Sequence, residues 1–447
     1  MNNIFDLLSK NVIDQGLCTH CGTCVGLSKG SLIMSETNNG PIPIPNSDNL
    51  NQLDPIIYDA CPGKGLNYPD ISNYTFNDKI NDWLLGYLNK TYIGYSNDKI
   101  IRRNGASGGI ITQVLVYLLS KGIIDGAIVS KMGIPKPWKA KVIIARTIDE
   151  IIECSQSIYS PVPVNEILNE VRNFDGKLGY VGLPDQVLSI RYLQSIDNKI
   201  AKKISFIIGP YVGTNMYIGS IKSFLRSNGY KTLESIKKLQ YRAGEWPGYL
   251  KILTDKGEEL KAEKFYYNYL IPFYITKSCL YTPDFTNELT DISVGDAWHP
   301  DYEKIGKGFS VIIARSLNGK NLLEEMKSAA VIELEEIDLN KVKNMHGHML
   351  DFKKRGSFIR FKFLKMMGKK VPNFGYLPKN ISIIRIIIEV IILSIIIFCS
   401  SSFARKVLEL FNPKFIGPPF NYFRLKWKNI SKPSKRKGLE NFEVKIQ

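Results

Sequence analysis

The chain has few cysteines and few histidines for its size. Its 447 residues include seven cysteines and four histidines. So few thiols cannot build a disulfide framework in a chain of this length, and this cysteine usage is typical of a reducing compartment. The chain opens Met-Asn-Asn-Ile-Phe-Asp, without the basic and then apolar order of a secretory signal. We therefore expect a cytoplasmic globular protein, with two or three domains on grounds of length.

Acidic residues are scarce in only one part of the chain. The formal net charge is +17, and residues 351–447 alone hold 21 Lys and Arg against 5 Asp and Glu. The preceding residues are close to neutral. Because the excess charge is confined to the C-terminal region, it does not indicate a nucleic-acid surface on the body of the protein. We expect no nucleic-acid partner.

Long uncharged apolar runs are also rare. The most apolar stretch, residues 381–400, is interrupted by Arg385 and Glu389, which lie one helical turn apart and can pair. Its longest uncharged run, 390–404, falls short of the roughly 18–20 residues that span a bilayer. The sequence predicts an apolar helix over 381–410, whose basic and aromatic flanks favour peripheral contact with a membrane surface. A spanning helix is one alternative, and packing on the body or on a partner protein is the other.

Two common phosphate-binding fingerprints are missing. No strand is followed by G-x-G-x-x-G, and no glycine loop ends in Gly-Lys-Ser/Thr. A glycine-rich turn nevertheless precedes the helical pattern at 110–121. The turn consists of Asn104, Gly105, Ala106, Ser107, Gly108 and Gly109. Ser107 is predicted to cap the helix, and the exposed N–H groups there would suit a phosphate or a flavin; a tight turn without a ligand is the alternative.

Four of the cysteines follow half of the pattern of a two-cluster ferredoxin. In that pattern each arm reads C-x2-C-x2-C-x3-C-P, and the last cysteine of one arm binds the cluster of the other. Here Cys18, Cys21 and Cys24 keep the first arm, Ser28 replaces its fourth cysteine, and Cys61 keeps the Cys-Pro of the second arm. These four cysteines are predicted to bind one [4Fe-4S] cluster. A structural zinc with four thiolates is the alternative.

The middle of the chain alternates short apolar runs with amphipathic stretches, which predicts an α/β body. Helices are expected at 110–121, 164–171 and 184–193, and strands at 126–130, 141–145, 178–181 and 204–209. The predicted organisation is a ferredoxin-like iron–sulfur segment over 1–66, a linker over 67–100, a mixed α/β body over 101–350, and a basic C-terminal region over 351–447.

Several separated motifs together resemble one known family. They are the cysteine segment 18–62, the glycine turn 104–109, Ser157-Ile-Tyr159 with Pro161-Val-Pro163, and the segments 182–186, 241–248 and 284–298. The chain is similar to the beta subunits of coenzyme F420 hydrogenase/dehydrogenase, in the branch often associated with surface-polysaccharide gene clusters. The resemblance implies a flavin-binding body with FAD, in an enzyme that moves electrons between a two-electron carrier such as coenzyme F420 and one-electron centres. The implied partner is a redox protein or a small-molecule electron carrier.

The same resemblance implies which residues contact the flavin, while no catalytic residue is assigned. The glycine turn 104–109 would cradle the flavin or its phosphates. Ser157, Tyr159 and Gln186 are the further polar contacts that it implies. A polar and aromatic group is expected from Asp291, Asp296 and Trp298, with a capped turn and a packed indole as the alternative.

The departures from the family pattern concern a second cluster in the body. The positions that would supply its four thiolates hold Asp185, Val212, Cys279 and Thr282. One thiol and one carboxylate cannot hold a cubane, so we expect the N-terminal cluster to be the only one. The predicted function is a flavin-dependent iron–sulfur oxidoreductase, with a role in cell-surface polysaccharide biosynthesis. The alternative is a redox adapter without catalysis, or a membrane-associated scaffold that keeps only a structural metal site.

Overall fold

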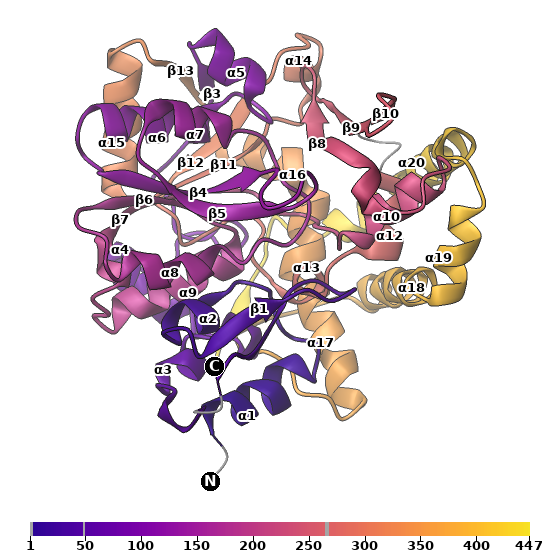
Figure 1. The fold of residues 1–447 in the computed structure, drawn as a ribbon, viewed down its shortest axis with the longest axis horizontal. Coiled ribbons are helices and arrows are strands. Elements are labelled where there is room, and N and C mark those ends of the chain that lie inside the picture. The colour runs from indigo at the N-terminus through magenta and orange to yellow at the C-terminus, as the bar shows by residue number, and fades with distance from the viewer. Residues whose placement is uncertain (1–2, 48–49, 264–267) are drawn as a thin grey trace.

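A mixed β-sheet forms the centre of the molecule. The computed structural model describes residues 3–47, 50–263 and 268–447. Within these ranges eight strands form one sheet in the order β13-β3-β12-β11-β7-β6-β4-β5 (Figure 1). The strands are β3 (Lys90–Ser96), β4 (Gly126–Met132), β5 (Ala140–Ala145), β6 (Leu178–Val181), β7 (Ile204–Pro210), β11 (Ile292–Asp296), β12 (Ser310–Ala314) and β13 (Ile332–Glu336). Neighbours among β4, β6, β7 and β11 run parallel, whereas the strands outside them pair antiparallel.

Helices cover both faces of this sheet. On one face lie α6 (Ile110–Ser120), α7 (Ile148–Glu153) and α15 (Leu317–Ser328); on the other lie α8 (Leu168–Val171) and α9 (Pro184–Ser195). The side chains of β4 alternate between the two cores, since Ala127 and Val129 join the first and Ile128 the second. Burial on both faces explains why these strands read as continuous apolar runs.

The predicted alternation of helices and strands is confirmed, as is the mixed α/β class. The predicted helix over 164–171 begins as the 3-10 turn η4 (Val164–Ile167) and continues as α8. The linker predicted over 67–100 is wrong. This segment contains α4 (Tyr68–Phe76) and β3, which is an internal strand between β13 and β12. Its many polar residues resemble a loop, but pairing on both edges of β3 satisfies the backbone and buries Tyr92 and Ile93.

The N-terminal segment is made of short elements that share the core of the body. They are α1 (Ile4–Leu8), the π-helical turn η1 (Ser9–Ile13), α2 (Thr23–Leu27), β1 (Leu32–Ser35), β2 (Ile42–Pro45) and α3 (Ile56–Asp59). The side chains of Leu27, Leu32 and Ile57 belong to the same buried cluster as Val187 and Leu188 of α9. The segment therefore packs directly on the sheet's helical layer.

A smaller antiparallel sheet flanks the body. It consists of β8 (Ile236–Ala243), β9 (Tyr249–Thr254) and β10 (Glu259–Glu263). Around it lie α10 (Gly219–Arg226) and α12 (Ile271–Tyr274), which share a buried cluster with the sheet, whereas α13 (Lys277–Tyr281) belongs to another cluster. β8 ends near the large sheet. Its residue Arg242 therefore reaches the glycine turn.

Helices dominate the C-terminal region. They are α16 (Leu339–Lys354), α17 (Gly356–Met366), α18 (Ile383–Cys399), α19 (Ser402–Glu409) and α20 (Pro413–Arg436). The predicted single helix over 381–410 is instead the pair α18 and α19, bent by 70°. In the described ranges no single helix has both the length and the apolar composition to cross a membrane; the bent pair has them only when its two members are taken together. The short strand β14 (Tyr376–Pro378) pairs with β15 (Val444–Ile446).

Candidate functional site

Four thiols converge on one cavity in the N-terminal segment. Cys18 and Cys21 lie in the loop before α2, Cys24 lies within α2, and Cys61 follows α3. All four line the same cavity. The other lining side chains are mainly apolar and include Leu8, Val12, Ile13, Met34 and Pro43. The fold thus brings Cys61 to three cysteines that are remote from it in the sequence.

Two kinds of metal site use four thiolates. A tetrahedral zinc with Zn–S bonds of about 2.3 Å needs sulfur atoms roughly 3.8 Å apart. In the described part of the chain, no three His, Cys, Asp or Glu side chains are grouped so that they could hold a single metal ion. A cubane separates its four cysteine ligands more widely, because irons and sulfides lie between them. The four thiols share one apolar cavity, and four thiolates are the ligand set that such a cluster uses.

Burial makes the thiols poor acids in the absence of a positive centre. It raises the pKa of Cys61 to about 12, and the nearby Cys21 contributes in the same direction. Burial and the other three cysteines also raise the pKa of Cys24 well above its ordinary value. A bound metal supplies the positive charge that keeps such thiols ionised.

The cysteine loop rests closely on η4 of the body. Asn165, fully buried, donates from its backbone N–H to the Cys21 carbonyl (2.8 Å) and from Nδ2 to Thr23 Oγ1 (2.9 Å). A Cβ at Gly22 would lie 2.7 Å from the backbone of η4, and a Cβ at Gly26 would lie 2.2 Å from the Asn165 carbonyl. The glycines therefore permit a backbone contact that fixes the position of the cysteines on the body.

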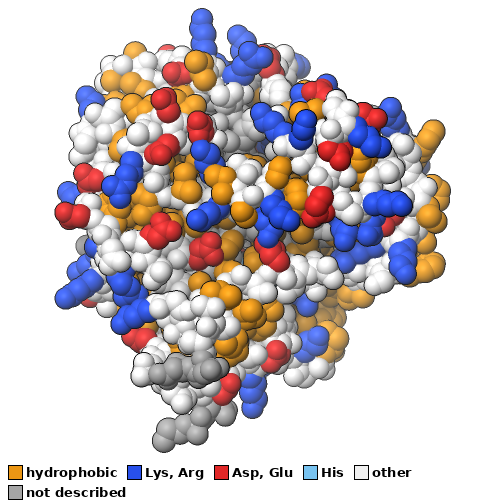
Figure 2. Space-filling model, viewed as in Figure 1, with side chains coloured by type: hydrophobic (Ala, Val, Ile, Leu, Met, Phe, Trp, Pro, Cys, Tyr) orange, Lys and Arg blue, Asp and Glu red, His pale blue; other side chains and the backbone are white. Residues whose placement is uncertain are grey.

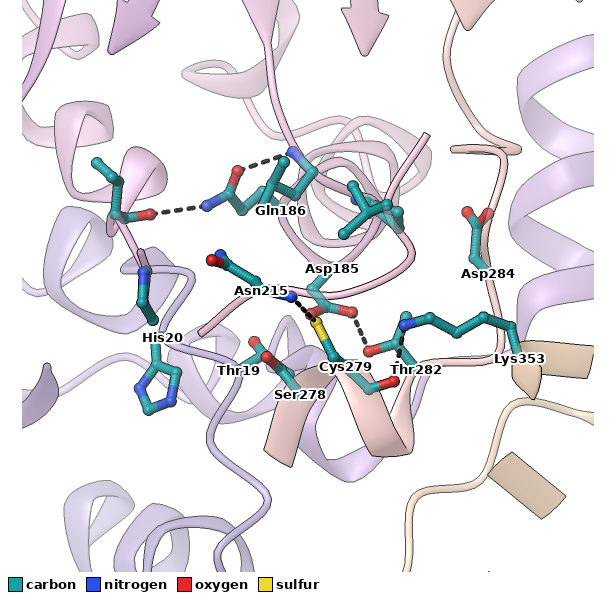
Figure 3. A pocket seen from close by; sticks show the side chains of 15 residues that line it. Thr19, His20, Asp185, Gln186, Asn215, Ser278, Cys279, Thr282, Asp284 and Lys353 are labelled. Carbon is teal, nitrogen blue, oxygen red and sulfur yellow. Dashed lines mark hydrogen bonds between the residues drawn. The ribbon is translucent and has the colours of Figure 1, made fainter. Parts of the chain in front are cut away.

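A second cavity adjoins the cysteine loop (Figure 3). Asp185, Val212, Cys279 and Thr282 all line it, although they come from three separate segments, since Cys279 and Thr282 both belong to α13 and its C-cap. The resemblance implied that these four positions correspond to ligands of a body cluster, and the fold does place them around one space. Thr19 of the cysteine loop lines both cavities.

The groups in the second cavity do not fit a cluster. Thr282 Oγ1 donates to Asp185 Oδ1 (2.5 Å), and the Asn215 backbone N–H donates to Cys279 Sγ (3.0 Å). Lys353, which is buried, extends into the cavity and donates from Nζ to the Cys279 carbonyl (2.7 Å). With one thiol, and with a cation in the same space, this cavity is a hydrogen-bonded polar chamber.

Burial shifts the titration of its charged groups. It raises the pKa of Asp185 from the ordinary value of 3.8 to about 6, against the opposing effects of the Thr282 hydrogen bond and the Lys353 charge. Burial also lowers the pKa of Lys353.

His20 lines this cavity, where its Nδ1 donates to the Pro41 carbonyl (2.7 Å), and it is absent from the lining of the cysteine cavity.

The glycine turn has a different geometry from the predicted one. The N-cap of α6 is Gly109, at φ +77°, and Ser107 does not cap the helix. Ser107 Oγ lies 2.8 Å from Ser310 Oγ instead. The turn is held against the sheet, since a Cβ at Gly108 would lie 2.6 Å from the Gly94 carbonyl of β3. The prediction of a serine cap is therefore wrong, because packing against β3 and β12 fixes the turn.

Arg242 of β8 links the glycine turn to two other predicted positions. Its Nη2 donates to the Ala106 carbonyl (2.5 Å), while Nη1 donates to Tyr159 Oη (3.2 Å) and Asp296 Oδ2 (3.1 Å). The Trp246 and Trp298 rings are stacked obliquely, with centroids 4.9 Å apart. Among the described residues, buried Arg242 Nε and Trp246 Nε1 have no hydrogen-bond partner. The Arg242 guanidinium is thus occupied by three acceptors of the chain, one of them the Asp296 carboxylate, while Arg242 Nε and Trp246 Nε1 are donors left for a ligand.

The other predicted flavin contacts are distributed unevenly. Gln186 donates to the Val162 carbonyl (2.8 Å) and accepts from the Leu183 backbone N–H (2.8 Å), so it closes the turn before α9. It lines the second cavity. Asn104 ends α5 (Lys99–Asn104), and Ser157 lies in the loop after α7.

Sequence reasoning missed the role of Arg242. The residue lies inside a motif that helped to identify the family, 241–248, but nothing local assigns it a partner. Its three acceptors come from the glycine turn, the loop after α7 and β11. The strand itself offers no signal, because β8 reads Ile-Lys-Lys-Leu-Gln-Tyr-Arg-Ala and Arg242 is one of its four polar residues.

Comparison with known proteins identifies the family. Residues 91–169 match the model for the N-terminal part of the coenzyme F420 hydrogenase/dehydrogenase beta subunit, and residues 175–340 match the model for its C-terminal part. Together the matches cover more than half of the chain. The protein belongs to the coenzyme F420 hydrogenase/dehydrogenase beta-subunit family, as its motifs predicted.

The relatives share moderate identity with the chain. The coenzyme F420 hydrogenase subunit beta of Methanothermobacter thermautotrophicus is 28% identical over 262 residues, covering 57% of this chain and 87% of the relative. The coenzyme F420-dependent sulfite reductase of Methanocaldococcus jannaschii is 26% identical over 348 residues, covering 74% of this chain but only 49% of the relative. A chain of the F420-reducing [NiFe] hydrogenase complex from Methanosarcina barkeri has a similar fold. Its TM-score is 0.52 at 24% identity, covering 66% of this chain and 98% of that one.

Replacement of Gly26 tests the contact between the cysteine loop and η4. Gly26→Ala is expected to lower the free energy of unfolding by about 1–3 kcal/mol, because its Cβ meets rigid backbone. Thermal unfolding measures the effect. The control is Gly213→Ala, whose Cβ meets chiefly the flexible end of Met349. Equal stability of the two variants would contradict the tight contact.

The buried Asp185 predicts a pH dependence of stability. Because the folded state keeps its proton up to about pH 6 while an unfolded Asp loses it near 3.8, stability falls as pH rises across this window. Asp185→Asn removes that loss. The variant should be more stable than the parent at pH 7 by up to about 3 kcal/mol, and similar to it at pH 4. Denaturant unfolding at both pH values, with exposed Asp175→Asn as control, checks this; a pH-independent difference would refute it.

Proposed function

We propose that this protein is a flavin-dependent iron–sulfur oxidoreductase subunit. It passes electrons between a two-electron carrier, coenzyme F420 or a similar molecule, and a single [4Fe-4S] cluster bound by Cys18, Cys21, Cys24 and Cys61. The observation that carries the proposal is the convergence of these four cysteines on one apolar cavity. The names of the family and of the relatives support coenzyme F420 as the carrier.

FAD is the proposed second cofactor, since a flavin can exchange electrons in pairs on one side and singly on the other. The glycine turn 104–109 and Tyr159 would hold it, with Arg242 fixing the turn through the Ala106 carbonyl. Asp296 keeps the Arg242 guanidinium oriented. The apolar lining of the cysteine cavity would exclude water from the cluster and so tune its potential.

The second cavity limits the number of one-electron centres. Asp185, Thr282 and Lys353 occupy it with hydrogen bonds, and only Cys279 supplies a thiol. The proposal therefore includes one cluster and no intermediate one-electron centre in the body. Asn215 engages Cys279 Sγ, which gives that thiol a structural role.

The remaining parts of the proposal concern the cellular setting. We propose a cytoplasmic protein that works with a redox partner protein or a small electron carrier, and that contacts a membrane peripherally through its C-terminal region. The names of two relatives support the partner, since they are subunits of hydrogenases. A role in cell-surface polysaccharide biosynthesis stays a prediction from the resemblance.

The alternative function is a redox adapter or a scaffold with a structural metal site only. Metal and flavin analysis of anaerobically purified protein separates the oxidoreductase from the scaffold, whereas a redox adapter would keep both cofactors and differ in oxidising or reducing no substrate of its own. About four irons with acid-labile sulfide and one flavin per chain support the oxidoreductase, whereas zinc without flavin would contradict it. Bleaching of the flavin by reduced coenzyme F420 would then identify the carrier.

The cysteine ligands can be tested one at a time. Cys21→Ser should remove most of the iron and the visible absorption of the cluster, because one of its four ligands is lost. Cys279→Ser is the matched control, since the second cavity is proposed to hold no cluster. Iron and sulfide assays measure both variants. Loss of iron from Cys279→Ser would contradict the single-cluster proposal.

The proposed flavin site depends on the guanidinium fork of Arg242. Arg242→Lys keeps the charge but cannot reach Ala106, Tyr159 and Asp296 together, so flavin affinity should fall by about tenfold or more. Flavin titration followed by fluorescence measures the dissociation constant. The control is Arg191→Lys, an arginine paired with Asp291 at 3.0 Å elsewhere in the body. Equal flavin affinity of the two variants would place the flavin elsewhere.

A further inference from the structure

Large apolar side chains lie exposed along the C-terminal helices. Ile383 of α18 is 76% exposed, Leu410 after α19 is 82% exposed, and Phe415 of α20 is 77% exposed. Ile387, Phe398 and Phe403 are exposed as well, and the six residues together are called the apolar rim. α18, α19 and α20 lie at one side of the molecule (Figure 1), where Figure 2 shows hydrophobic side chains beside Lys and Arg. Exposed apolar surface on this scale marks an interaction site.

α18 has its polarity reversed relative to an ordinary surface helix. Its only charged residues, Arg385 and Glu389, are both 0% exposed and face the body, while isoleucine and phenylalanine face outward. Arg385 Nε lies 2.7 Å from Asp351 Oδ2, and Arg385 Nη2 lies 2.7 Å from Glu389 Oε2. A helix that is apolar on its outer face suits contact with lipid better than contact with water.

The same ion pairs fix the orientation of α18. Asp351 belongs to α16, and Arg360 of α17, which also pairs with Glu389, is buried. To cross a bilayer, α18 would have to leave these partners and carry Arg385 and Glu389 into hydrocarbon. The 70° bend between α18 and α19 also prevents a straight span. The helices are therefore placed to lie along an interface.

The charge of this region selects the kind of interface. Residues 402–436 contain nine Lys and Arg and one acidic residue, Glu409, whose carboxylate pairs with Arg226 (3.1 Å). Lys406, Lys414 and Lys426 are exposed on the same helices as the apolar rim. Apolar side chains combined with uncompensated basic residues fit a layer of acyl chains beneath anionic headgroups.

We propose that α18, α19 and α20 form a peripheral anchor that lies on an anionic bilayer. The apolar rim enters the boundary between headgroups and acyl chains, and Lys406, Lys414 and Lys426 contact the anionic headgroups. This inference extends the peripheral contact proposed above by assigning its surface and its lipid. It is independent of the redox chemistry, because vesicle binding and cofactor content are measured separately on the same protein.

Co-sedimentation of the full chain with lipid vesicles tests the anchor. The parent protein should bind vesicles that contain phosphatidylglycerol and bind pure phosphatidylcholine vesicles far more weakly, and added salt should weaken the binding. The triple variant Lys406→Glu, Lys414→Glu, Lys426→Glu should lose on the order of 100-fold in partitioning. Its control reverses the charge of three lysines outside the region, Lys231→Glu, Lys237→Glu and Lys238→Glu, and should bind like the parent.

A second variant tests insertion of apolar side chains. Phe403→Gln with Phe415→Gln should reduce partitioning by about tenfold or more, because less apolar area is buried in the membrane. Ile100→Gln with Ile305→Gln changes two exposed apolar residues elsewhere and should leave partitioning unchanged. Circular dichroism and iron content confirm that each variant is folded.

Four results would overturn the proposal. The first is absence of binding to anionic vesicles, and the second is equal binding by test and control variants. The third is failure of the parent to bind vesicles, together with a dimer in light scattering that the Phe403→Gln, Phe415→Gln variant loses. In that case the apolar rim would join two copies of the chain. Bound protein that resists extraction with alkaline carbonate would also contradict a peripheral anchor and indicate a span.

Discussion

The close approach of the cysteine loop to η4 is the contact on which the rest of the arrangement depends. At Gly22 and Gly26 the two backbones lie too close for any side chain, and buried Asn165 joins them with hydrogen bonds. Buried backbone groups must find partners, so this contact is satisfied only in one relative position. That position places the cysteine cavity beside the second cavity, with Thr19 lining both.

The two neighbouring cavities have opposite chemistry. The first is lined by four thiols and apolar side chains, which suits a group that brings its own positive charge. The second contains a carboxylate, a lysine and hydrogen-bonded hydroxyl and thiol groups. Here Asp185 and Lys353 are both removed from water, and burial shifts the pKa of each toward its neutral form. The second cavity therefore lies where the family pattern would place cluster ligands, but in this protein it is a hydrogen-bonded polar part of the core.

Charge is distributed unusually in the C-terminal region. Asp351, Arg360, Arg385 and Glu389 are buried together, although buried ion pairs contribute little net stability compared with well-packed apolar groups. These ion pairs instead fix the orientation of α18, because each buried charged group requires its particular partner. The network holds α18 with its apolar face outward, so buried ion pairs determine which face of this helix is exposed.

Local signals predicted much of the body. Continuous apolar runs gave β4, β6 and β7, because strands buried on both faces need apolar residues throughout. They failed for β3, since its polar residues resemble a loop and its pairing partners β12 and β13 lie more than two hundred residues away. Likewise Ser107 follows the local rule for a cap, yet packing of the glycine turn against β3 and Ser310 overrides it.

The sequence by itself determined the family and the basic excess of the C-terminal region, and it predicted the four cysteines as one set of ligands, because these depend on residue type and spacing. Only the tertiary structure brought Cys61 to the other three cysteines, gathered Asp185, Val212, Cys279 and Thr282 around one cavity, and joined Ala106, Tyr159 and Asp296 through Arg242. The physical reason is common to all three. Each contact joins residues that are distant in the chain, and its geometry is decided by how the sheet, η4 and β8 pack together.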